Sequence, residues 1–243
     1  MLKAYKYRLY PNKQQGILLQ KSFGCCRWIY NWALKEKHEF FVKENKSVSI
    51  FQLDLKLKSL KASEETKWLK EVNSQSLQQA LKNLDIAYTR FFKKQGKYPV
   101  FKSKKDKKSF SNPQQAAVSF EKQKIFIPKF RDGIKCVFHR QFEGKIKNIT
   151  ISQNKSGGYY ASILVETLNV IPEKFKIEKE RTVGIDLGLK DLAILSDGTR
   201  FENPKTLKKH LKKLKKLCKI HSNKQKGSKN REKARIKLVR AYE

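Results

Sequence analysis

The 243-residue chain is short of acidic residues. It has 22 Asp and Glu against 56 Lys and Arg, which gives a formal net charge of +34. A charge of that size repels itself in a compact protein and calls for a polyanionic partner. Nucleic acid is the first candidate and an anionic membrane surface is the second. A disordered basic tail is excluded, because 39% of the residues are hydrophobic and aromatic residues are plentiful.

Long apolar runs and paired cysteines are also missing. Without a run of about 18 apolar residues, the sequence predicts no transmembrane helix. Met1–Arg8 alternates polar and apolar residues and lacks a signal-peptide core, so we expect a cytoplasmic protein with free thiols. The four cysteines form no C-x-x-C pair, which argues against zinc in this chain. They are Cys25, Cys26, Cys136 and Cys218.

Short β-branched and aromatic runs separated by turn residues occupy positions 110–166, and Asp132-Gly133 is one predicted turn. The runs are Ile125–Ile127, Ile134–Phe138, Ile146–Ile151 and Tyr159–Glu166. Regularly spaced short strands favour a small barrel. Leu2–Tyr10 also alternates, ends before Pro11 and has no strand near it in sequence. We therefore expect it to join the barrel, with the intervening helical block as an insertion.

Helical patterns occupy residues 12–94. Asn12 is predicted to cap a first helix that Gly24 ends, and a second helix follows. The expected apolar positions of the later helices are Ile29, Trp32, Ala33, Phe40, Leu53, Leu57, Leu60, Leu77, Leu81, Leu84, Tyr88, and Phe91 or Phe92. The strongest pattern is Asn73–Lys94.

The other side of the Asn73–Lys94 helix is rich in amides, including Gln75 and Gln78, and carries Lys82. Amide side chains can pair with adenine edges and lysine can reach guanine. A merely solvated helix face is the competing interpretation.

Lys93–Lys108 has eight lysines and one acid. Tyr98 and Phe101 lie among these lysines, which include Lys102, Lys104 and Lys105. Aromatic rings among lysines suit stacked bases and a bound phosphate backbone. A mobile basic loop is the alternative.

A glycine-flanked carboxylate follows a charged linker at Val170–Glu180. Val183–Gly188 alternates apolar residues with Gly184, Asp186 and Gly188, which is typical of a strand with one apolar face. The two glycines leave room for a phosphate backbone to approach Asp186. A second strand is expected at residues 192–195, a turn at Asp197-Gly198, and a third strand at residues 199–201.

A carboxylate in the first strand of such a meander is where a hydrolytic fold would hold a divalent metal. The competing interpretation is a solvated Asp at a strand edge. Actin-like ATPases open with a similar pattern, but they would need hydroxyl residues where Leu189-Lys190 stand.

Lys205–Arg240 predicts a basic helical hairpin with sixteen Lys and Arg and one acid. One apolar stripe is expected at Leu207, Leu211, Leu214 and Cys218, and the other at Ala234, Leu238 and Ala241. Two helices with thin apolar stripes and basic backs favour nucleic acid over a merely solvated face. The candidate contacts are Lys209, Lys212, Lys213, Lys216, Lys229 and Arg231. Because no helix stop signal precedes residue 243, we expect the chain to end inside this domain.

Several short motifs match one family in order along the whole chain. They are Tyr7–Pro11, Phe23–Asn31, Trp68–Val72, Leu81–Leu84, Val183–Gly188 and Gly227–Arg231. With these motifs the chain resembles TnpB, the OrfB-type protein of bacterial insertion sequences and the apparent ancestor of type V CRISPR nucleases.

The resemblance implies an α+β fold with three parts. A wedge-type β-barrel would comprise residues 1–11 and 109–170, and a helical recognition insertion residues 12–108. An incomplete RuvC-like (RNase H-like) nuclease domain with the basic hairpin would comprise residues 171–243.

The resemblance also implies RNA-guided cleavage of double-stranded DNA, with guide RNA and target DNA as partners and no membrane. Asp186 would be the first catalytic carboxylate and a Mg²⁺ ligand. Gln78 and Gln114 occupy positions that read a short DNA motif, although Ser74 and Gln75 differ from other members. The family's other two carboxylates and its zinc ribbon would lie past residue 243.

Three hypotheses therefore stay open. The chain is the N-terminal part of a Mg²⁺-dependent nuclease that cleaves only when the rest is supplied, or it is a non-catalytic remnant that binds guide RNA or DNA. A ribosome-associated RNA-binding protein is the third, and it rests on charge alone.

Overall fold

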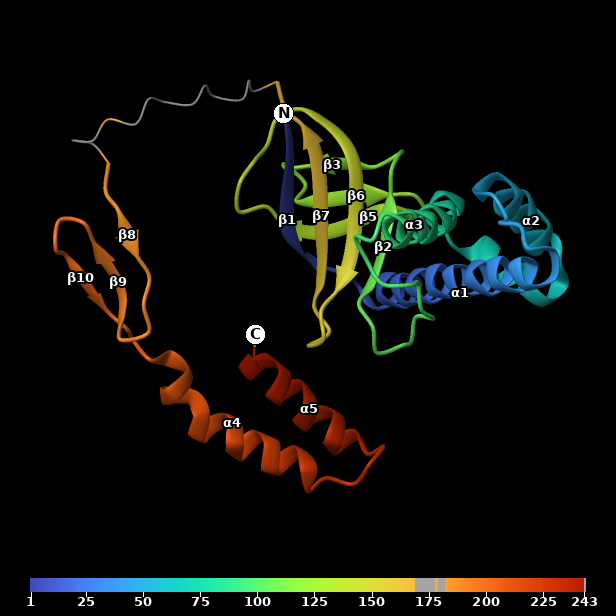
Figure 1. Cartoon of the computed structure of the whole chain (residues 1–243). Coiled ribbons are helices and arrows are strands. Elements are labelled where there is room, and N and C mark those ends of the chain that lie inside the picture. The colour runs from blue at the N-terminus through green and yellow to red at the C-terminus, as the bar shows by residue number, and fades with distance from the viewer. Residues whose placement is uncertain (169–177, 179–181, 243) are drawn as a thin grey trace. The chain divides into compact units, whose positions relative to one another are not determined.

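The computed structural model describes the whole chain except residues 169–177, 179–181 and 243 (Figure 1). The chain divides into two compact units, Met1–Asn169 and Val170–Glu243. The charged linker predicted at Val170–Glu180 lies outside the described residues, apart from Glu178. Among the described residues, no helix combines the length and apolarity needed to cross a bilayer.

The first unit is built on an antiparallel sheet of seven strands in the order β2-β6-β7-β1-β5-β4-β3. The strands are β1 (Leu2–Tyr10), β2 (Lys108–Asn112), β3 (Ala117–Ser119), β4 (Lys124–Ile127), β5 (Phe130–Val137), β6 (Lys145–Gln153) and β7 (Tyr159–Glu166). The first strand pairs with β7 over eight residues and with β5 over its last three. The prediction that Leu2–Tyr10 joins the later strands is confirmed.

The predicted barrel is not closed in the described part of the chain. The edge strands β2 and β3 do not pair with each other, so the sheet is open. Figure 1 shows β3 and β5 running across the direction of β1, β6 and β7. Only Arg8, Leu9 and Tyr10 of β1 reach β5, so the sheet turns sharply at that short junction. The sheet curls but does not close, because the short edge strand β3 pairs with β4 and not with β2.

The turn predicted at Asp132-Gly133 is also wrong, since both residues lie inside β5. The hairpin instead turns between Ile127 and Phe130, which face each other in the β4–β5 register. Gly133 sits at φ +67 beside an irregularity in that register. A Cβ there would lie 2.8 Å from the ring of Phe126. Gly133 therefore lies at a bulge within β5. Glycine is common both at bulges and in turns, so the sequence does not distinguish the two.

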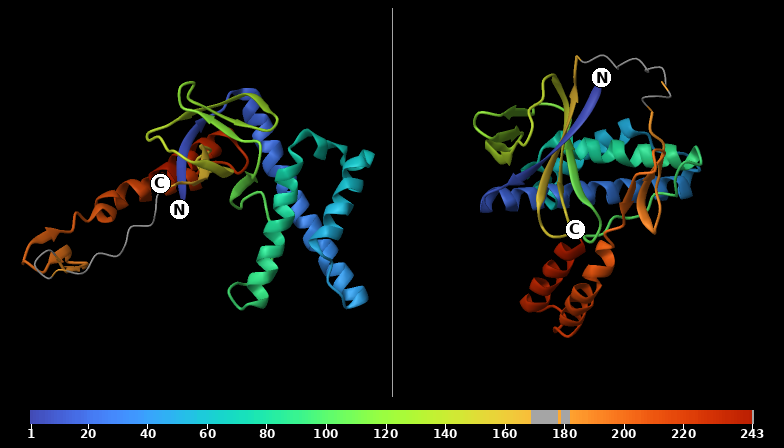
Figure 2. Two further views of the ribbon diagram at one scale, coloured as in Figure 1. Left: turned by 90° about the horizontal axis from the view of Figure 1, so that it is seen from above. Right: turned by 90° about the vertical axis from the view of Figure 1, so that its left-hand side faces the viewer.

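Four helical segments lie between β1 and β2 in the chain. They are α1 (Lys13–Glu44), α2 (Ile50–Ala62), the 3₁₀ helix η1 (Glu64–Glu71) and α3 (Ser74–Phe92). Figures 1 and 2 show α1 and α3 running side by side next to the sheet. Asn12 caps α1 through a capping box, as predicted, and Asn73 caps α3.

The break predicted at Gly24 does not occur, and α1 continues through it. A glycine inside a helix costs about 1 kcal/mol relative to alanine. Phe23, Cys25 and Cys26 on either side of it are buried in the core, and their packing offsets that cost. Most expected core positions on the later helices are confirmed, since Ile29, Ala33, Leu53, Leu57, Leu77, Leu81 and Leu84 are buried. Trp32, Phe40, Leu60, Tyr88 and Phe91 are half-buried, and Phe92 is exposed.

The second unit has a three-stranded antiparallel sheet and a helical hairpin. Its elements are β8 (Ile185–Asp186), β9 (Asp191–Leu195), β10 (Arg200–Glu202), α4 (Thr206–Ser222) and α5 (Lys229–Tyr242). The sheet order β10-β9-β8 confirms the predicted meander. Its predicted apolar face is real but uncovered by the described residues, because Val183, Ile185 and Leu187 are 52%, 63% and 75% exposed.

The hairpin packs on a thinner seam than the sequence predicts. Leu214 and Ala234 are its buried residues, and Leu238 and Ala241 are half-buried as expected. On α4, however, Leu207, Leu211 and Cys218 are exposed. Leu217, three residues after Leu214, is half-buried instead.

Candidate nucleic-acid interface

Asp186 lies at the end of the short strand β8, opposite Ile194 of β9, and it is exposed. Next to it, the N–H of Gly184 donates to the Ser196 hydroxyl at 3.1 Å, and the N–H of Ser196 donates to the Gly184 carbonyl at 2.9 Å. A Cβ at Gly188 would lie 3.0 Å from the Asp191 carbonyl oxygen. Gly188 is therefore needed by the β8–β9 turn itself, whatever approaches the carboxylate.

The other aspartates of this sheet serve the fold. Asp197 Oδ1 accepts the Thr199 N–H at 2.8 Å, and this backbone hydrogen bond holds the pKa of the Asp197 carboxyl below its usual range. Asp191 lies 3.9 Å from the guanidinium of Arg200. Among the described residues, no donor or cation contacts the Asp186 side chain, and no three His, Cys, Asp or Glu residues form a metal-binding group.

The basic hairpin presents most of its predicted contacts to solvent. Lys209, Lys212, Lys213, Lys216 and Lys229 are all exposed. Arg231 differs, because its guanidinium donates to the Lys224 carbonyl at 2.6 Å and closes the turn between α4 and α5. A helical back of free ammonium groups with few acids between them is suited to a phosphate backbone.

Of the two predicted motif-reading residues, Gln78 lies near the N-terminal end of α3, and Gln114 lies in the loop between β2 and β3. The Gln78 amide donates to both oxygens of Asp54 on α2, at 3.0 and 3.1 Å. Gln114 accepts a hydrogen bond at 3.0 Å from Gln75, which is one helical turn before Gln78. The structure thus brings Gln78 and Gln114 to one region, and the Gln78 amide is bound to Asp54.

The lysines of the helical block fall into two groups. Lys82, Lys104 and Lys105 are exposed. Lys102 is anchored: its ammonium lies 3.7 Å from the centre of the Tyr30 ring, and its backbone exchanges two hydrogen bonds with the Asn31 amide. Desolvation at this position lowers the pKa of the Lys102 ammonium. Its first role is to fasten the 93–108 segment onto α1.

Sequence reasoning missed a basic and aromatic face on the sheet. Arg8 donates to the Tyr160 hydroxyl at 2.6 Å, and the cations of Lys6 and Arg8 lie 4.8 and 4.9 Å from the centre of the Tyr160 ring. The alternation of β1 places Lys6 and Arg8 on the exposed side, opposite buried Tyr7 and Leu9. The register that brings Tyr160 beside Arg8 joins residues 152 positions apart, which no local pattern reveals.

Two family models of OrfB proteins from IS605-type elements match the chain. One, described as "Helix-turn-helix domain", matches residues 1–46, and the other, described as "Probable transposase", matches residues 162–243. The chain belongs to the OrfB (TnpB) family. The resemblance seen in the sequence motifs is confirmed. Residues 1–46 of this OrfB protein form a strand and one continuous helix, rather than a helix-turn-helix.

Curated relatives of this OrfB protein align with nearly all of it. It is 36% identical over 241 residues to "Putative RNA-guided DNA endonuclease InsQ" of Escherichia coli (strain K12). It is 34% identical over 243 residues to "Putative RNA-guided DNA endonuclease" of Streptomyces pristinaespiralis. Each alignment covers 99% of this chain and 59% of the relative, so the OrfB chain spans less than two thirds of either length.

One solved structure also matches the OrfB chain weakly. It is titled "Cryo-EM structure of the Cas12f1-sgRNA-target DNA complex". The match covers 99% of this chain and 65% of that chain, with 14% sequence identity and a TM-score of 0.36. A TM-score at this level establishes no shared fold.

Proposed function

We propose that this chain carries the nucleic-acid-binding part of an RNA-guided DNA endonuclease of the transposon-encoded TnpB type. Guide RNA and double-stranded target DNA are the proposed partners. The observation that carries the proposal is the α4–α5 hairpin, whose exposed lysines lie in a chain alignable over 99% of its length with proteins named as such enzymes. The net charge of +34 points the same way.

Each unit has a proposed part in that function. The curled sheet of the first unit would act as the wedge, and α1–α3 as the recognition insertion that reads a short DNA motif through Gln78 and Gln114. The second unit would be the RuvC-like portion, with Asp186 as its first carboxylate. The hairpin lysines would neutralise phosphates, a term that supplies affinity without sequence preference.

The residues described here do not fit a Mg²⁺ site by themselves. Mg²⁺ requires about six oxygen ligands in near-octahedral geometry. Asp186 offers one carboxylate, and no cluster of three metal-binding side chains occurs within the described parts of the chain. We therefore derive no metal-dependent step here, and we expect residues 1–243 alone not to cleave DNA.

A non-catalytic binding protein is the second candidate. It is favoured by the surroundings of Asp186, which belongs to no cluster of three metal-binding side chains among the described residues. Both candidates predict binding of guide RNA or DNA with a steep dependence on salt, because many phosphates would be neutralised. They differ only in whether cleavage appears when the further carboxylates that the family resemblance implies are supplied.

The test is a Mg²⁺-dependent cleavage assay with the region of the Escherichia coli relative that has no counterpart in this chain fused after residue 243. Cleavage that disappears in Asp186→Ala, with unchanged nucleic-acid binding, is the result expected for the endonuclease. Equal cleavage with and without Asp186 would dismiss its role. Salt-insensitive binding by the unfused chain would argue against both candidates.

A further inference from the structure

A cluster of aromatic rings at the C-terminal end of α3 has two exposed members and two half-buried ones. Tyr88, Phe91, Phe92 and Tyr98 form this aromatic platform, with neighbouring ring centres between 5.2 and 6.2 Å apart. Phe92 is 74% exposed and Tyr98 is 46% exposed. Large apolar side chains left this open need a reason when they are contiguous, because burying them would stabilise the fold.

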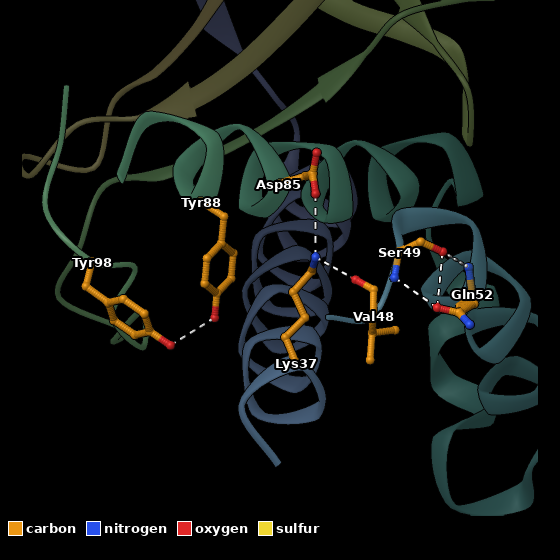
Figure 3. A network of polar contacts seen from close by, with 7 residues as sticks. All are labelled: Lys37, Val48, Ser49, Gln52, Asp85, Tyr88 and Tyr98. Atoms are coloured by element: carbon orange, nitrogen blue, oxygen red, sulfur yellow. Dashed lines mark hydrogen bonds and ion pairs between the residues drawn. The ribbon is translucent and has the colours of Figure 1, made fainter. Parts of the chain in front are cut away.

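The platform is held rigidly by a network that reaches the core (Figure 3). The Tyr98 and Tyr88 hydroxyls are hydrogen-bonded at 3.1 Å, and the Tyr88 ring faces the ammonium of Lys37 at 5.3 Å. That ammonium donates to the Val48 carbonyl at 2.7 Å and lies 3.5 Å from a carboxylate oxygen of Asp85. Lys37 is buried, so this exposed cluster is fixed in place by the interior.

The chain reverses direction to bring Tyr98 onto the helix. Lys94 adopts a left-handed conformation at φ 58, and the N–H of Gln95 donates to the Arg90 carbonyl at 2.8 Å. This helix-ending geometry folds the following residues back toward α3. Tyr98 then packs edge-on against both Tyr88 and Phe91. The platform is therefore a product of the turn as well as of the helix.

The segment that carries the platform is rich in positive charge. Arg90, Lys93, Lys94 and Lys97 are all exposed, and no acidic residue occurs between Asp85 and Asp106. The nearer of these two acids, Asp85, is already engaged by Lys37. An apolar protein partner would not require so strong an excess of one charge, whereas a polyanion with flat apolar faces would use both features.

We propose that the aromatic platform binds the unpaired bases of a single-stranded nucleic acid, with the surrounding cations holding its phosphates. The inference rests on the proposed nucleic-acid-binding function and adds a second site to the hairpin. Base–aromatic stacking contributes about 1–3 kcal/mol per base and tolerates any sequence. The platform thus distinguishes a strand with free bases from a duplex, which the hairpin lysines do not.

The test compares the full chain on an oligothymidylate and on an abasic strand of the same length and charge. We expect the wild type to bind the thymidylate strand at least about fivefold more tightly, the lower end of stacking one base. Phe92→Ala should lower that ratio, and Phe92→Ala with Tyr98→Ala should bring it close to one. Phe92→Trp should keep or raise it. An oligouridylate arm shows whether RNA serves as well as DNA.

The matched control is Phe51→Ala on α2. Phe51 is 72% exposed, like Phe92, but Gln52 and Asp54 follow it instead of lysines. Phe51→Ala should leave the ratio of the two affinities unchanged. Because the Phe92 side chain is largely exposed, we expect Phe92→Ala to fold like the wild type. A ratio unaffected by the platform variants, or equal losses on both strands, would overturn the platform. A wild-type chain that binds neither strand would overturn the proposed function instead.

Discussion

The two units treat the same residue types in opposite ways. In Met1–Asn169, cations and amides have structural partners: Lys37 is bonded to Val48 and Asp85, and the Gln78 amide to Asp54. On the hairpin of the second unit, Lys212 and Lys216 are exposed and engage no acid among the described residues. A lysine in the first unit therefore more often stabilises the fold, and a lysine on the hairpin is available to a ligand.

Apolar residues show the same contrast. Among the residues that the structure describes, nearly all buried apolar side chains belong to one core in the first unit, and Leu214 and Ala234 are the buried hydrophobic residues of the second. The second unit instead exposes Ile185, Leu187 and Leu189. Burial should therefore stabilise mainly the first unit, whereas the hairpin of the second unit should contribute charge rather than a core.

The largest expected effect is on the first unit's core. Leu81→Ala on α3 removes a fully buried side chain and should lower the free energy of unfolding by about 2–5 kcal/mol. Ile185→Ala, at a 63% exposed position of the second unit, should change it by less than about 0.5 kcal/mol. Urea unfolding followed by tryptophan fluorescence measures Leu81→Ala, because all three tryptophans lie in the first unit. Far-ultraviolet circular dichroism, which reports on both units, measures Ile185→Ala. Equal losses would contradict this difference between the units.

The next effect concerns a buried cation. Lys37→Ala leaves the Val48 carbonyl and Asp85 without their partner and should cost about 1–3 kcal/mol. The control is Lys35→Ala two positions earlier, where an exposed ion pair with Glu39 at 3.7 Å should contribute less than about 0.5 kcal/mol. The same urea titration compares them. A Lys37 variant as stable as the Lys35 variant would show that the network is dispensable.

These contrasts also explain which helices, strands and turns could be predicted from the sequence. Periodicity located α3 and the strands β6 and β7 because their burial follows local alternation. It failed at Gly24 and Gly133, where long-range packing decides whether a glycine ends an element or is carried within it. The open sheet could not be predicted either, because closure depends on which distant edges meet.

The candidate site was predictable in its residue types but not in its partners. Charge density alone located the hairpin lysines, and family motifs pointed to Asp186 and Gln78. The Asp54 carboxylate that holds Gln78 and the Tyr30 ring under Lys102 come from other elements, so no spacing along the chain could reveal them. The prediction that Cys218 packs inside the hairpin was wrong. Leu217 and Cys218 are adjacent, and helical spacing from Leu214 allows either one to be the inner residue; in the structure it is Leu217.

A smaller effect is expected in binding. Lys212→Gln with Lys216→Gln should weaken binding to duplex DNA of any sequence, and each lost phosphate contact should lower the slope of log affinity against log salt by about 0.9. The matched control replaces Lys21 and Lys56, which are paired with Glu71 and Glu36 in the first unit. Anisotropy titrations at several salt concentrations separate the two. An equal change of slope in both variants would mean that ion pairing does not decide availability.

The last effect is a loss of stability at alkaline pH, confined to the first unit. Burial raises the pKa of the Cys25 thiol to about 11 and of the Cys136 thiol to about 12. In the unfolded chain these thiols titrate at about 8.5, so above that pH the unfolded state binds fewer protons than the folded state. The free energy of unfolding should therefore be unaffected by the thiols below about pH 8.5 and fall as the pH rises toward 11.

Two single variants isolate this term. Cys136→Ala removes one buried thiol, so its unfolding free energy should start lower than that of the wild type and then fall less steeply between about pH 8 and pH 10. Cys218→Ala removes the exposed thiol of α4 and should leave both the value and the slope unchanged. Because tryptophan fluorescence follows only the first unit, a shallower slope in Cys136→Ala assigns the alkaline loss to that unit's core. Parallel slopes in the wild type and Cys136→Ala would show that burial of this thiol leaves its titration uncoupled from folding.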